Sequence, residues 1–346
     1  MTLSLALEAR ALSQLPSRRD EDWRWTDLRG LIRELPAPSP EVTAEISPGP
    51  FGDEGEAELL VVNGRVRGDA GLLTLAEGEA RVVRLRFVSA TAATGHGVKL
   101  AVSLAPGAQL TLLESYEGLA PDYLADAALG VRLETGARLE RIVLAGDHAE
   151  GVSVSTASVS LAPGADFAQT VLTDGARRQR LETRVEHPGQ SAAVRMDGAY
   201  LVADRRHADL TTAVNHAGTD GTTDQLVKGV VADQGRGVFQ GRITVSPGAD
   251  RTDARMGHHA LLLSDRAEVN AKPELLIFAD DVACAHGNTV GALDEDALFY
   301  AQQRGIPEAE ARAMLTEAFI GEVIDRIVHE GAREVARAWA AHRRVG

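Results

Sequence analysis

The sequence is poor in cysteine, in aromatic residues and in clustered positive charge. Cys284 is the only cysteine among 346 residues, which excludes an internal disulfide framework and a C-x-x-C zinc site. The net charge is −14, and the basic residues, nearly all arginine, are dispersed among acidic ones, so we expect no nucleic-acid partner. Aromatic residues make up 4% of the chain, too few to favour a groove in which rings stack on sugars.

Long apolar runs are absent as well. No run approaches the roughly 18 residues that a membrane-spanning helix requires. The segment from Met1 to Arg19 lacks the charged start and the long apolar stretch of a secretory signal. We therefore expect a cytoplasmic protein with no membrane partner.

The common catalytic signatures are missing too. The chain has no P-loop, so we expect it to bind no nucleotide in that manner, and it has neither a G-x-S-x-G nor an H-E-x-x-H motif. The stretch Gly235 to Gly241 spaces its third glycine one residue too far for a dinucleotide fingerprint, and we interpret it as a β-turn. These absences favour a protein that is not an enzyme.

The N-terminal part predicts a short helix followed by a linker. Apolar residues fall at helical spacing from Leu3 to Leu15, and Pro16 ends the pattern. The segment from Leu35 to Glu58, rich in proline and acidic residues, resembles a linker. We assign residues 1–57 to this region. Within it, Trp23 and Trp25 are candidates for anchoring the segment by their apolar area, although they could equally bind a partner.

The middle of the chain consists of short β-rich runs separated by glycine turns, and we assign residues 58–291 to it. The turns recur with glycines at 107, 136, 164 and 248, at intervals of 29, 28 and 84, the last being three times 28. A turn repeated about every 28 residues predicts a solenoid of stacked β-coils, although two turns expected between 164 and 248 are missing. The alternative is a β-sandwich whose turns happen to be alike. The predicted strands are Glu58 to Val62, Ala80 to Val88, Val98 to Leu104, Gln109 to Glu114, Arg138 to Leu144, Val152 to Leu161 and Phe167 to Leu172.

The last part, residues 292–346, predicts helices. Asp294 precedes an apolar helical pattern as a capping residue, and Arg304 and Gly305 end that helix. Pro307 begins a second helix, and a helical tail extends to Arg344. The predicted apolar stripe of the second helix contains Leu315, Ala318, Phe319, Val323 and Ile327.

Two adjacent pairs of polar residues are weak candidates for a site. His258 and His259 follow each other on a predicted strand, so their side chains point to opposite faces and are poorly placed to bind one metal ion. Asp280 and Asp281 diverge for the same reason, and one of them is expected to cap a turn or pair with an arginine.

Cys284 and His286 form a stronger candidate. Residues two apart on a strand project from the same face, so a thiolate and an imidazole could bind iron or an iron-sulfur species together. The alternatives are a buried cysteine beside a hydrogen-bonded histidine, and a Cys-His nucleophile. Their Cα atoms would lie roughly 6 to 7 Å apart, which suits a shared ligand site better than proton transfer.

The stretch around these residues resembles the SufD family of the SUF iron-sulfur cluster assembly system. The resemblance is close from Val214 to Val328 and includes the Asp-Asp-Val-x-Cys-x-His-Gly motif at Asp280 to Gly287. The Glu21 to Thr26 segment is similar to the N-terminal motif of the family, whereas residues 51–209 share only its general pattern of short β-rich runs broken by glycine. Met256 to His259 replaces the more polar run typical of the family. The related SufB subunit is similar, and the single cysteine and the shorter chain favour SufD.

The resemblance implies a mainly β fold: a right-handed parallel β-helix flanked by helical regions at both ends. It implies a scaffold subunit that pairs with SufB through the β-helix and binds the SufC ATPase through its C-terminal helices. Cys284 and His286 would then lie at the SufB interface, where an iron-sulfur cluster is held transiently. Because one cysteine and one histidine are fewer than the usual four or so ligands, the partner would supply the others.

The resemblance also bears on further partners and cofactors. A flavin is associated with the intact complex of the family, and no flavin-binding motif is visible in this chain. We expect the isolated chain to be able to form a homodimer, because the edge meant for SufB would otherwise be open. The residues expected at the ATPase interface are Leu298, Phe299, Tyr300, Arg304, Leu315 and Phe319.

Two other functions remain as alternatives. The first is a carbohydrate-active enzyme with a β-helix groove, which the low aromatic content disfavours. The second is a purely structural partner in which His286 is buried and hydrogen-bonded. In that case replacing His286 would lower stability, whereas a scaffold role predicts an intact fold and lost cluster assembly.

Overall fold

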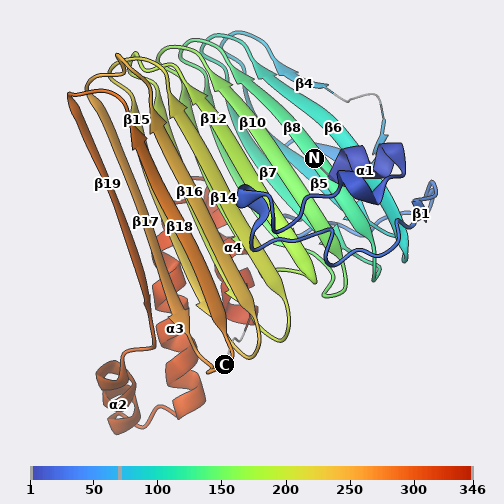
Figure 1. The fold of residues 1–346 in the computed structure, drawn as a ribbon, viewed down its shortest axis with the longest axis vertical. Coiled ribbons are helices and arrows are strands. Elements are labelled where there is room, and N and C mark those ends of the chain that lie inside the picture. The colour runs from blue at the N-terminus through green and yellow to red at the C-terminus, as the bar shows by residue number, and fades with distance from the viewer. Residues whose placement is uncertain (1–2, 69–71, 344–346) are drawn as a thin grey trace.

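A computed structural model describes residues 3–68 and 72–343 and confirms the predicted β-solenoid (Figure 1). The chain winds through about eight turns, and each turn contributes one strand to each of two facing sheets. All strand pairs along the solenoid are parallel, as expected when each coil stacks on the preceding one. Among the described residues, one antiparallel strand pair is present, at the N-terminal end of the solenoid.

The first sheet, sheet A, carries the N-terminal segment on its outer face. Its strands in spatial order are β1 (Ala37–Pro38), β6 (Thr94–Leu104), β8 (Leu124–Leu133), β10 (Val152–Leu161), β12 (Arg178–His187), β14 (His207–His216), β16 (Arg236–Val245) and β18 (Glu268–Ile277), with β4 (Leu72–Leu75) also paired to β6.

The second sheet, sheet B, carries the C-terminal helices. Its strands in spatial order are β19 (Val282–Gly291), β17 (Thr252–Leu262), β15 (Thr222–Val231), β13 (Ala193–Val202), β11 (Asp166–Thr173), β9 (Arg138–Gly146), β7 (Gln109–Gly118), β5 (Ala80–Ser89), β2 (Ala57–Val62) and β3 (Arg65–Arg67). All seven predicted strands are present within these bounds or close to them.

The repeating corner of the solenoid explains the period and its apparent gaps. The predicted glycines 107, 136, 164 and 248 all have positive φ, between 67° and 81°. The two turns missing from the sequence pattern exist. In the first, Gly189 (φ 75°), Gln190 (φ 53°) and Ser191 (φ 62°) are all left-handed, and in the second Asp220 (φ 61°) takes this conformation. Backbone hydrogen bonds link successive corners, from Gly164 to Gln190 and from Gln190 to Thr219. The repeat is therefore continuous in the backbone, although the left-handed residues of its corners are not always glycine.

The interior between the sheets is a continuous apolar core with a few buried polar groups. Alternate residues of each strand point inwards, so Leu112, Val143, Phe167 and Phe239 belong to one core cluster. Arg141 is buried there and donates to both carboxylate oxygens of Glu114, at 2.7 and 2.6 Å. This ion pair satisfies both charges inside the rod.

The N-terminal segment packs across the outer face of sheet A. The helix α1 (Leu3–Ala9) is shorter than predicted because Arg10 adopts a left-handed conformation, and two short 3-10 helices follow at Leu12–Gln14 and Glu21–Trp23. The Arg180 guanidinium lies 4.4 Å from the centre of the Trp23 ring, and Arg180 donates to the Asp22 carbonyl at 2.7 Å. Trp23 therefore packs against the rod.

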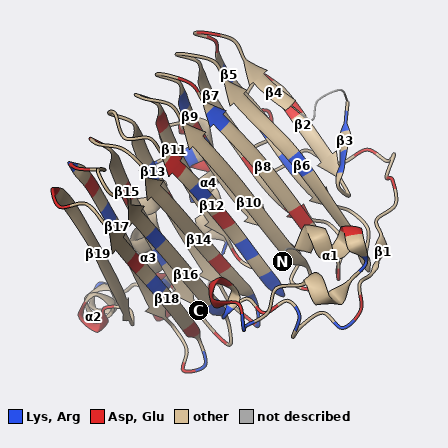
Figure 2. Cartoon of the chain, turned by 45° about the horizontal axis from the view of Figure 1, so that its top comes forward, with Lys and Arg blue, Asp and Glu red and all other residues tan. Residues whose placement is uncertain are grey.

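Charged residues on sheet A form pairs between strands. Figure 2 shows Lys, Arg, Asp and Glu on β12, β14, β16 and β18. Arg180 of β12 pairs with Asp209 of β14 at 2.9 Å, and Arg242 of β16 pairs with Glu274 of β18 at 3.0 Å.

Three sequence interpretations are wrong in detail. Gly235 to Gly241 is not a β-turn, because residues from Arg236 onwards form β16, a central strand paired with β14 and β18. The segment from Leu35 to Glu58 is irregular but is packed, since it contributes β1 and buries Phe51. The buried stripe of the second C-terminal helix is shifted, because Ile320 and Ile324 are buried whereas Ala318 is exposed.

The C-terminal helices are α2 (Glu295–Gln303), α3 (Glu308–Ile324) and α4 (Glu330–His342). The side chain of Asp294 caps α2 as predicted, accepting from the amides of Asp296 and Ala297. Helices α3 and α4 pack on the outer face of sheet B, where Ile320, Val323 and Trp339 contact residues of the central strands. Figure 1 shows α2 projecting beyond the sheets. Arg344, where the predicted helical tail ends, lies outside the described residues. No helix in the described ranges is long and apolar enough to cross a membrane.

Candidate metal-ligand site at the end of the solenoid

Cys284 and His286 lie on β19, the last strand of sheet B. β19 pairs with β17 on one side, and among residues 3–68 and 72–343 no strand pairs with its other edge. The register places Cys284 beside Ala254 and His286 beside Met256, both of which are buried. Strand alternation gives Cys284, His286 and Asn288 the same face, which is the inner face of the coil. The two predicted ligands are therefore brought together at the open end of the rod.

The burial of the two candidate ligands differs. Cys284 is half-buried and packs against the apolar core cluster, whereas His286 is exposed. Burial raises the pKa of the Cys284 thiol, opposed by a hydrogen bond from the Ala254 backbone and helped by the negative charge of Asp253. The thiol of the free chain is thus protonated at neutral pH. Iron binding would have to displace that proton.

A hydrogen-bond chain that begins in the buried core of the rod reaches this strand. The Tyr200 hydroxyl lies 2.8 Å from Nε2 of His258, and Nδ1 of His258 lies 2.6 Å from Oδ1 of Asn288. With Nδ1 protonated, the ring donates to Asn288 and accepts from Tyr200. Burial lowers the pKa of His258 to about 4, so the ring is neutral at neutral pH. This chain holds β19 two residues from His286.

Sequence reasoning missed the role of His258 and Asn288. The prediction that His258 and His259 point to opposite faces is correct: His258 is buried, whereas His259 bonds the Thr289 hydroxyl at 2.8 Å on the outer face. The position of Asn288, two residues beyond His286, was the available signal. The buried partner Tyr200 is far away in the sequence and could not be found from spacing.

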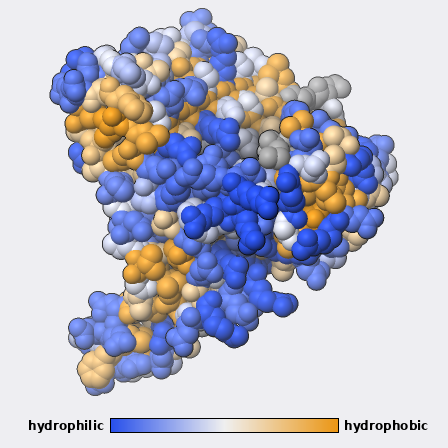
Figure 3. Space-filling view, in the orientation of Figure 1, coloured by the Kyte–Doolittle hydropathy of each residue, from blue (hydrophilic) through white to orange (hydrophobic). Residues whose placement is uncertain are grey.

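Exposed apolar side chains lie at one corner of the open end. Leu276, Ile277 and Phe278, which follow one another at the end of β18, are all exposed, Phe278 at 62%. Figure 3 shows an apolar area at the end of the rod formed by the last strands. An exposed cluster of this kind beside an unpaired strand edge is typical of a protein-protein contact.

The described part of the chain cannot complete a metal site alone. No group of three or more His, Cys, Asp and Glu side chains in residues 3–68 and 72–343 could hold an ion together. Asp280 and Asp281 lie in the turn before β19, where the Asp281 carbonyl accepts from the Arg251 amide. Cys284 and His286 are only two side chains, so any metal site that includes them would need ligands from elsewhere.

The residues expected at the ATPase interface lie on two helices: those on α2 are mostly exposed, and those on α3 are half-buried against sheet B. Phe299 and Tyr300 on α2 are exposed, Leu298 is half-buried, and Arg304 donates to the Tyr300 hydroxyl at 2.6 Å. Leu315 and Phe319 on α3 are half-buried. Phe319 packs on sheet B with the ammonium of Lys228 4.4 Å from its ring centre.

Comparison with known proteins gives one family. Residues 87–319 match the family model described as SUF system FeS cluster assembly, SufBD core domain. This match covers most of the solenoid together with α2 and most of α3.

Several curated proteins are similar along the chain. The iron-sulfur cluster assembly protein SufD of Escherichia coli is 32% identical over 247 residues, covering 71% of this chain and 58% of that protein. An iron-sulfur cluster assembly SufBD family protein of Synechocystis is 29% identical, covering 66% of this chain and 52% of that protein. A SufBD family protein of Mycobacterium bovis is 26% identical, covering 95% and 89%. The alignments thus span little more than half the length of the first two relatives.

Proposed function

The chain belongs to the SUF-system SufBD core family, and on this premise we propose that it is a non-enzymatic scaffold subunit for iron-sulfur cluster assembly. The observation that carries the proposal is the position of Cys284 and His286. They share the inner face of a strand whose outer edge is unpaired in the described structure, at an end of the rod lined by apolar residues.

The cluster would be the cargo of the site and would be shared between two chains. Iron-sulfur clusters are held by about four protein ligands, of which this chain supplies a thiolate and an imidazole. A SufB subunit, docked edge to edge on β19, would supply the others. The same edge would allow the isolated chain to form a homodimer. A reducing compartment such as the cytoplasm suits this role, because the ligand thiol must stay reduced.

The C-terminal helices would receive the ATPase subunit, SufC. α2 projects beyond the sheets and presents Phe299 and Tyr300 to solvent, which are suitable anchors for a protein contact. Leu298, Arg304, Leu315 and Phe319 would border that contact. Since α3 is packed on sheet B, a movement of the helices driven by the ATPase could reach the rod. Nucleotide would bind to the partner.

The proposal is tested by purifying this chain with the SufB and SufC proteins of the same organism and reconstituting the complex with iron and sulfide without oxygen. We compare the wild type with His286→Ala and with His259→Ala, a matched control on the outer face of β17. An intact complex that loses most of its visible cluster absorption only with His286→Ala supports the proposal. Equal absorption in all three complexes contradicts it.

The same experiment separates the scaffold role from a purely structural one. His286 is exposed, so His286→Ala is expected to leave the thermal unfolding temperature of the isolated chain unchanged. A clear fall in that temperature together with loss of the complex would favour a structural role for His286.

A further inference from the structure

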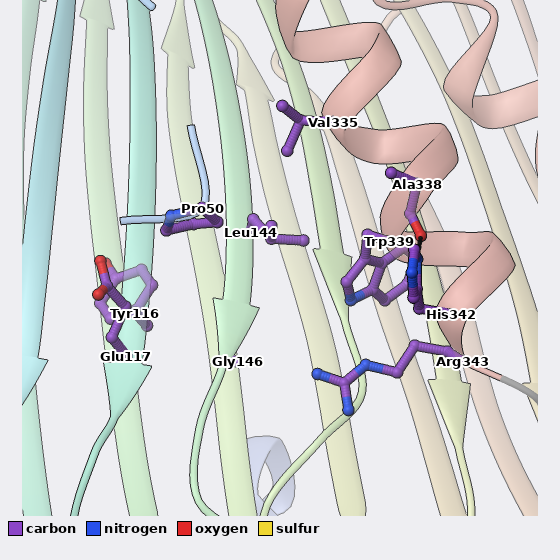
Figure 4. Close-up of a pocket in the computed structure, with 10 residues that line it drawn as sticks. All are labelled: Pro50, Tyr116, Glu117, Leu144, Gly146, Val335, Ala338, Trp339, His342 and Arg343. Carbon is purple, nitrogen blue, oxygen red and sulfur yellow. Dashed lines mark hydrogen bonds between the residues drawn. The ribbon is translucent and has the colours of Figure 1, made fainter. Parts of the chain in front are cut away.

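A cavity of about 480 Å³ lies between the outer face of sheet B and the end of α4, far along the sheet from β19 (Figure 4). Leu144 of β9 and Tyr116 and Glu117 of β7 contribute the wall on the sheet side, and Trp339 and Arg343 contribute the opposite wall. Its volume is in the range of small-molecule sites, roughly 300 to 1,000 Å³. Neither the family match nor the proposed cluster site accounts for it.

Part of the cavity wall is apolar. Leu144, Val335 and Pro50 line it, and Leu144 belongs to the apolar cluster beneath the helices. In Figure 4 these three side chains lie along the upper part of the cavity. A flat apolar body could pack against them without displacing a polar group.

The indole N–H of Trp339 is the second observation that points to a ligand. Trp339 is only 8% exposed, and its Nε1 is buried without a hydrogen-bond partner in residues 3–68 and 72–343. Figure 4 shows this nitrogen turned towards the space between the sheet and α4. A buried donor normally has a partner, so an acceptor is expected there.

The charges beside the cavity favour an anionic acceptor. Arg343 pairs with Asp174 Oδ2 at 2.7 Å, and Asp174 also pairs with Arg206 at 3.2 Å. The carboxylate of Glu117 is engaged by two nitrogens of Arg86, both at 2.8 Å. Because both acids are paired with arginines, the groups that an incoming ligand can use are the Trp339 indole N–H and the guanidinium N–H groups of Arg343 that are not bonded to Asp174.

We propose that this cavity binds a small organic carboxylate with a flat apolar body. The body packs on Leu144, Val335 and Pro50, and the carboxylate accepts from the Trp339 indole N–H and the Arg343 guanidinium. Such a ligand bridges α4 and sheet B, so it stabilises the docking of the C-terminal helices on the rod. This inference does not rest on the proposed cluster site.

The test uses the full chain labelled with ¹⁵N in its three indole groups and naphthalene-1-acetate as the probe. The Trp339→Phe variant assigns the Trp339 indole signal, because that signal disappears. Saturable movement of this signal with naphthalene-1-acetate, and at least tenfold weaker movement with the matched alcohol 2-(1-naphthyl)ethanol, supports the proposal.

Variants then locate the binding. Affinity for naphthalene-1-acetate, measured by calorimetry, is expected to fall at least tenfold in Trp339→Phe and at least fivefold in Arg343→Gln, and to stay unchanged in Trp25→Phe. Equal affinity in all variants, equal affinity for acid and alcohol, or no saturable binding at millimolar probe overturns the proposal, the last because the cavity then holds water only. If Trp339→Phe unfolds at a lower temperature, Arg343→Gln alone decides the outcome.

Discussion

Strands β17 and β19 are neighbours in one sheet and pair residue for residue, yet their inner faces have different environments. On β17, Ala254 and Met256 are buried, Met256 at 2%. On β19, their partners Cys284 and His286 are half-buried and exposed. The same coil geometry therefore makes one strand part of the core and leaves the inner face of the next partly open to solvent. What differs is that one more coil lies beyond β17 and none beyond β19 in the described residues.

The flanks of the rod repeat this contrast. The N-terminal segment covers part of sheet A, and α3 and α4 cover part of sheet B. In the structure described, no strand pairs with the outer edges of β18 and β19. The residues Leu276, Ile277 and Phe278, where β18 ends, are exposed and apolar. The middle is thus expected to determine stability and the end to determine function.

Phe239 and Phe299 compare a core ring with an exposed one. Phe239 is fully buried on β16 and stacks on His258 with ring centres 4.9 Å apart, whereas Phe299 is 62% exposed on α2. Phe239→Ala should lower the free energy of unfolding by about 3 to 5 kcal/mol, because it leaves a cavity in the core. Phe299→Ala should leave it unchanged within error. Urea denaturation measures both, and a loss below about 1 kcal/mol for Phe239→Ala would show that the core is not packed as described.

Two ion pairs give the same comparison for charges. Arg141 and Glu114 are buried in the middle, whereas Arg251 and Asp220 pair at 2.7 Å in an exposed corner near the end. Arg141→Leu should cost about 3 to 5 kcal/mol, since Glu114 is left buried without a partner, and adding Glu114→Leu should recover part of the loss. Arg251→Leu should have no measurable effect, because solvent screens that pair. Equal losses for the two arginine variants would contradict this assignment.

His258 predicts a pH dependence that belongs to the core. Burial lowers its pKa to about 4 from an ordinary 6.5, so the unfolded chain binds more protons between these values. The contribution of the neutral ring is present above pH 6.5 and is lost as the pH falls towards 4. His258→Gln should reduce the slope of stability against pH in this window by up to about 1.4 kcal/mol per pH unit. Chemical denaturation at several pH values measures the slope.

Other buried histidines also contribute to the slope of stability against pH, and this contribution should remain in the His258→Gln variant. Burial also lowers the pKa of His96 and His207 to about 4 and that of His216 to about 3. His258→Gln should therefore flatten the dependence only in part. An unchanged slope would mean that His258 is already solvated and is not part of the chain from Tyr200 to Asn288.

Only a small effect on stability is expected from the candidate ligand Cys284 at the end of the rod. Cys284→Ser exchanges a half-buried thiol for a hydroxyl and should change the free energy of unfolding by less than about 1 kcal/mol. In the reconstituted complex it should reduce cluster absorption, because the thiolate ligand is lost. If Cys284→Ser instead unfolds the chain, Cys284 is a core residue like Ala254 and Met256 of β17, and the prediction is wrong.

The solenoid could be predicted from the sequence because its corners repeat both a glycine-containing turn and a spacing of about 28 residues. The glycines at 107, 136 and 164 carry positive φ in successive coils. In the next corner Gly189 shares this conformation with Gln190 and Ser191, and in the one after it Asp220 adopts it, so the spacing of the glycines is lost there. Gly235 to Gly241 was misinterpreted because glycines in a central strand look like turn residues until the partners β14 and β18 are known.

The candidate site was predictable only in its local part. The shared face of Cys284 and His286 was predictable, because it follows from their spacing of two residues on one strand. The connection through His258 to Tyr200, and the cavity beside Trp339, depend on strands and helices far apart in the sequence. The shift of the α3 stripe towards Ile320 and Ile324 depends likewise on how the helix lies on sheet B.

The contrast between β17 and β19 is tested most directly through the single cysteine. The rate at which Cys284 reacts with a thiol reagent is measured in the chain alone, at a dilution where sedimentation reports a monomer, and in the complex with SufB and SufC. A matched variant, Cys284→Ser with Ala254→Cys, moves the only thiol one strand inwards to a buried position. We predict that Cys284 reacts in the free chain and at least tenfold more slowly in the complex, while the moved thiol is unreactive in both. A Cys284 rate that is the same with and without the partners would contradict the assignment of this end of the rod as the shared site.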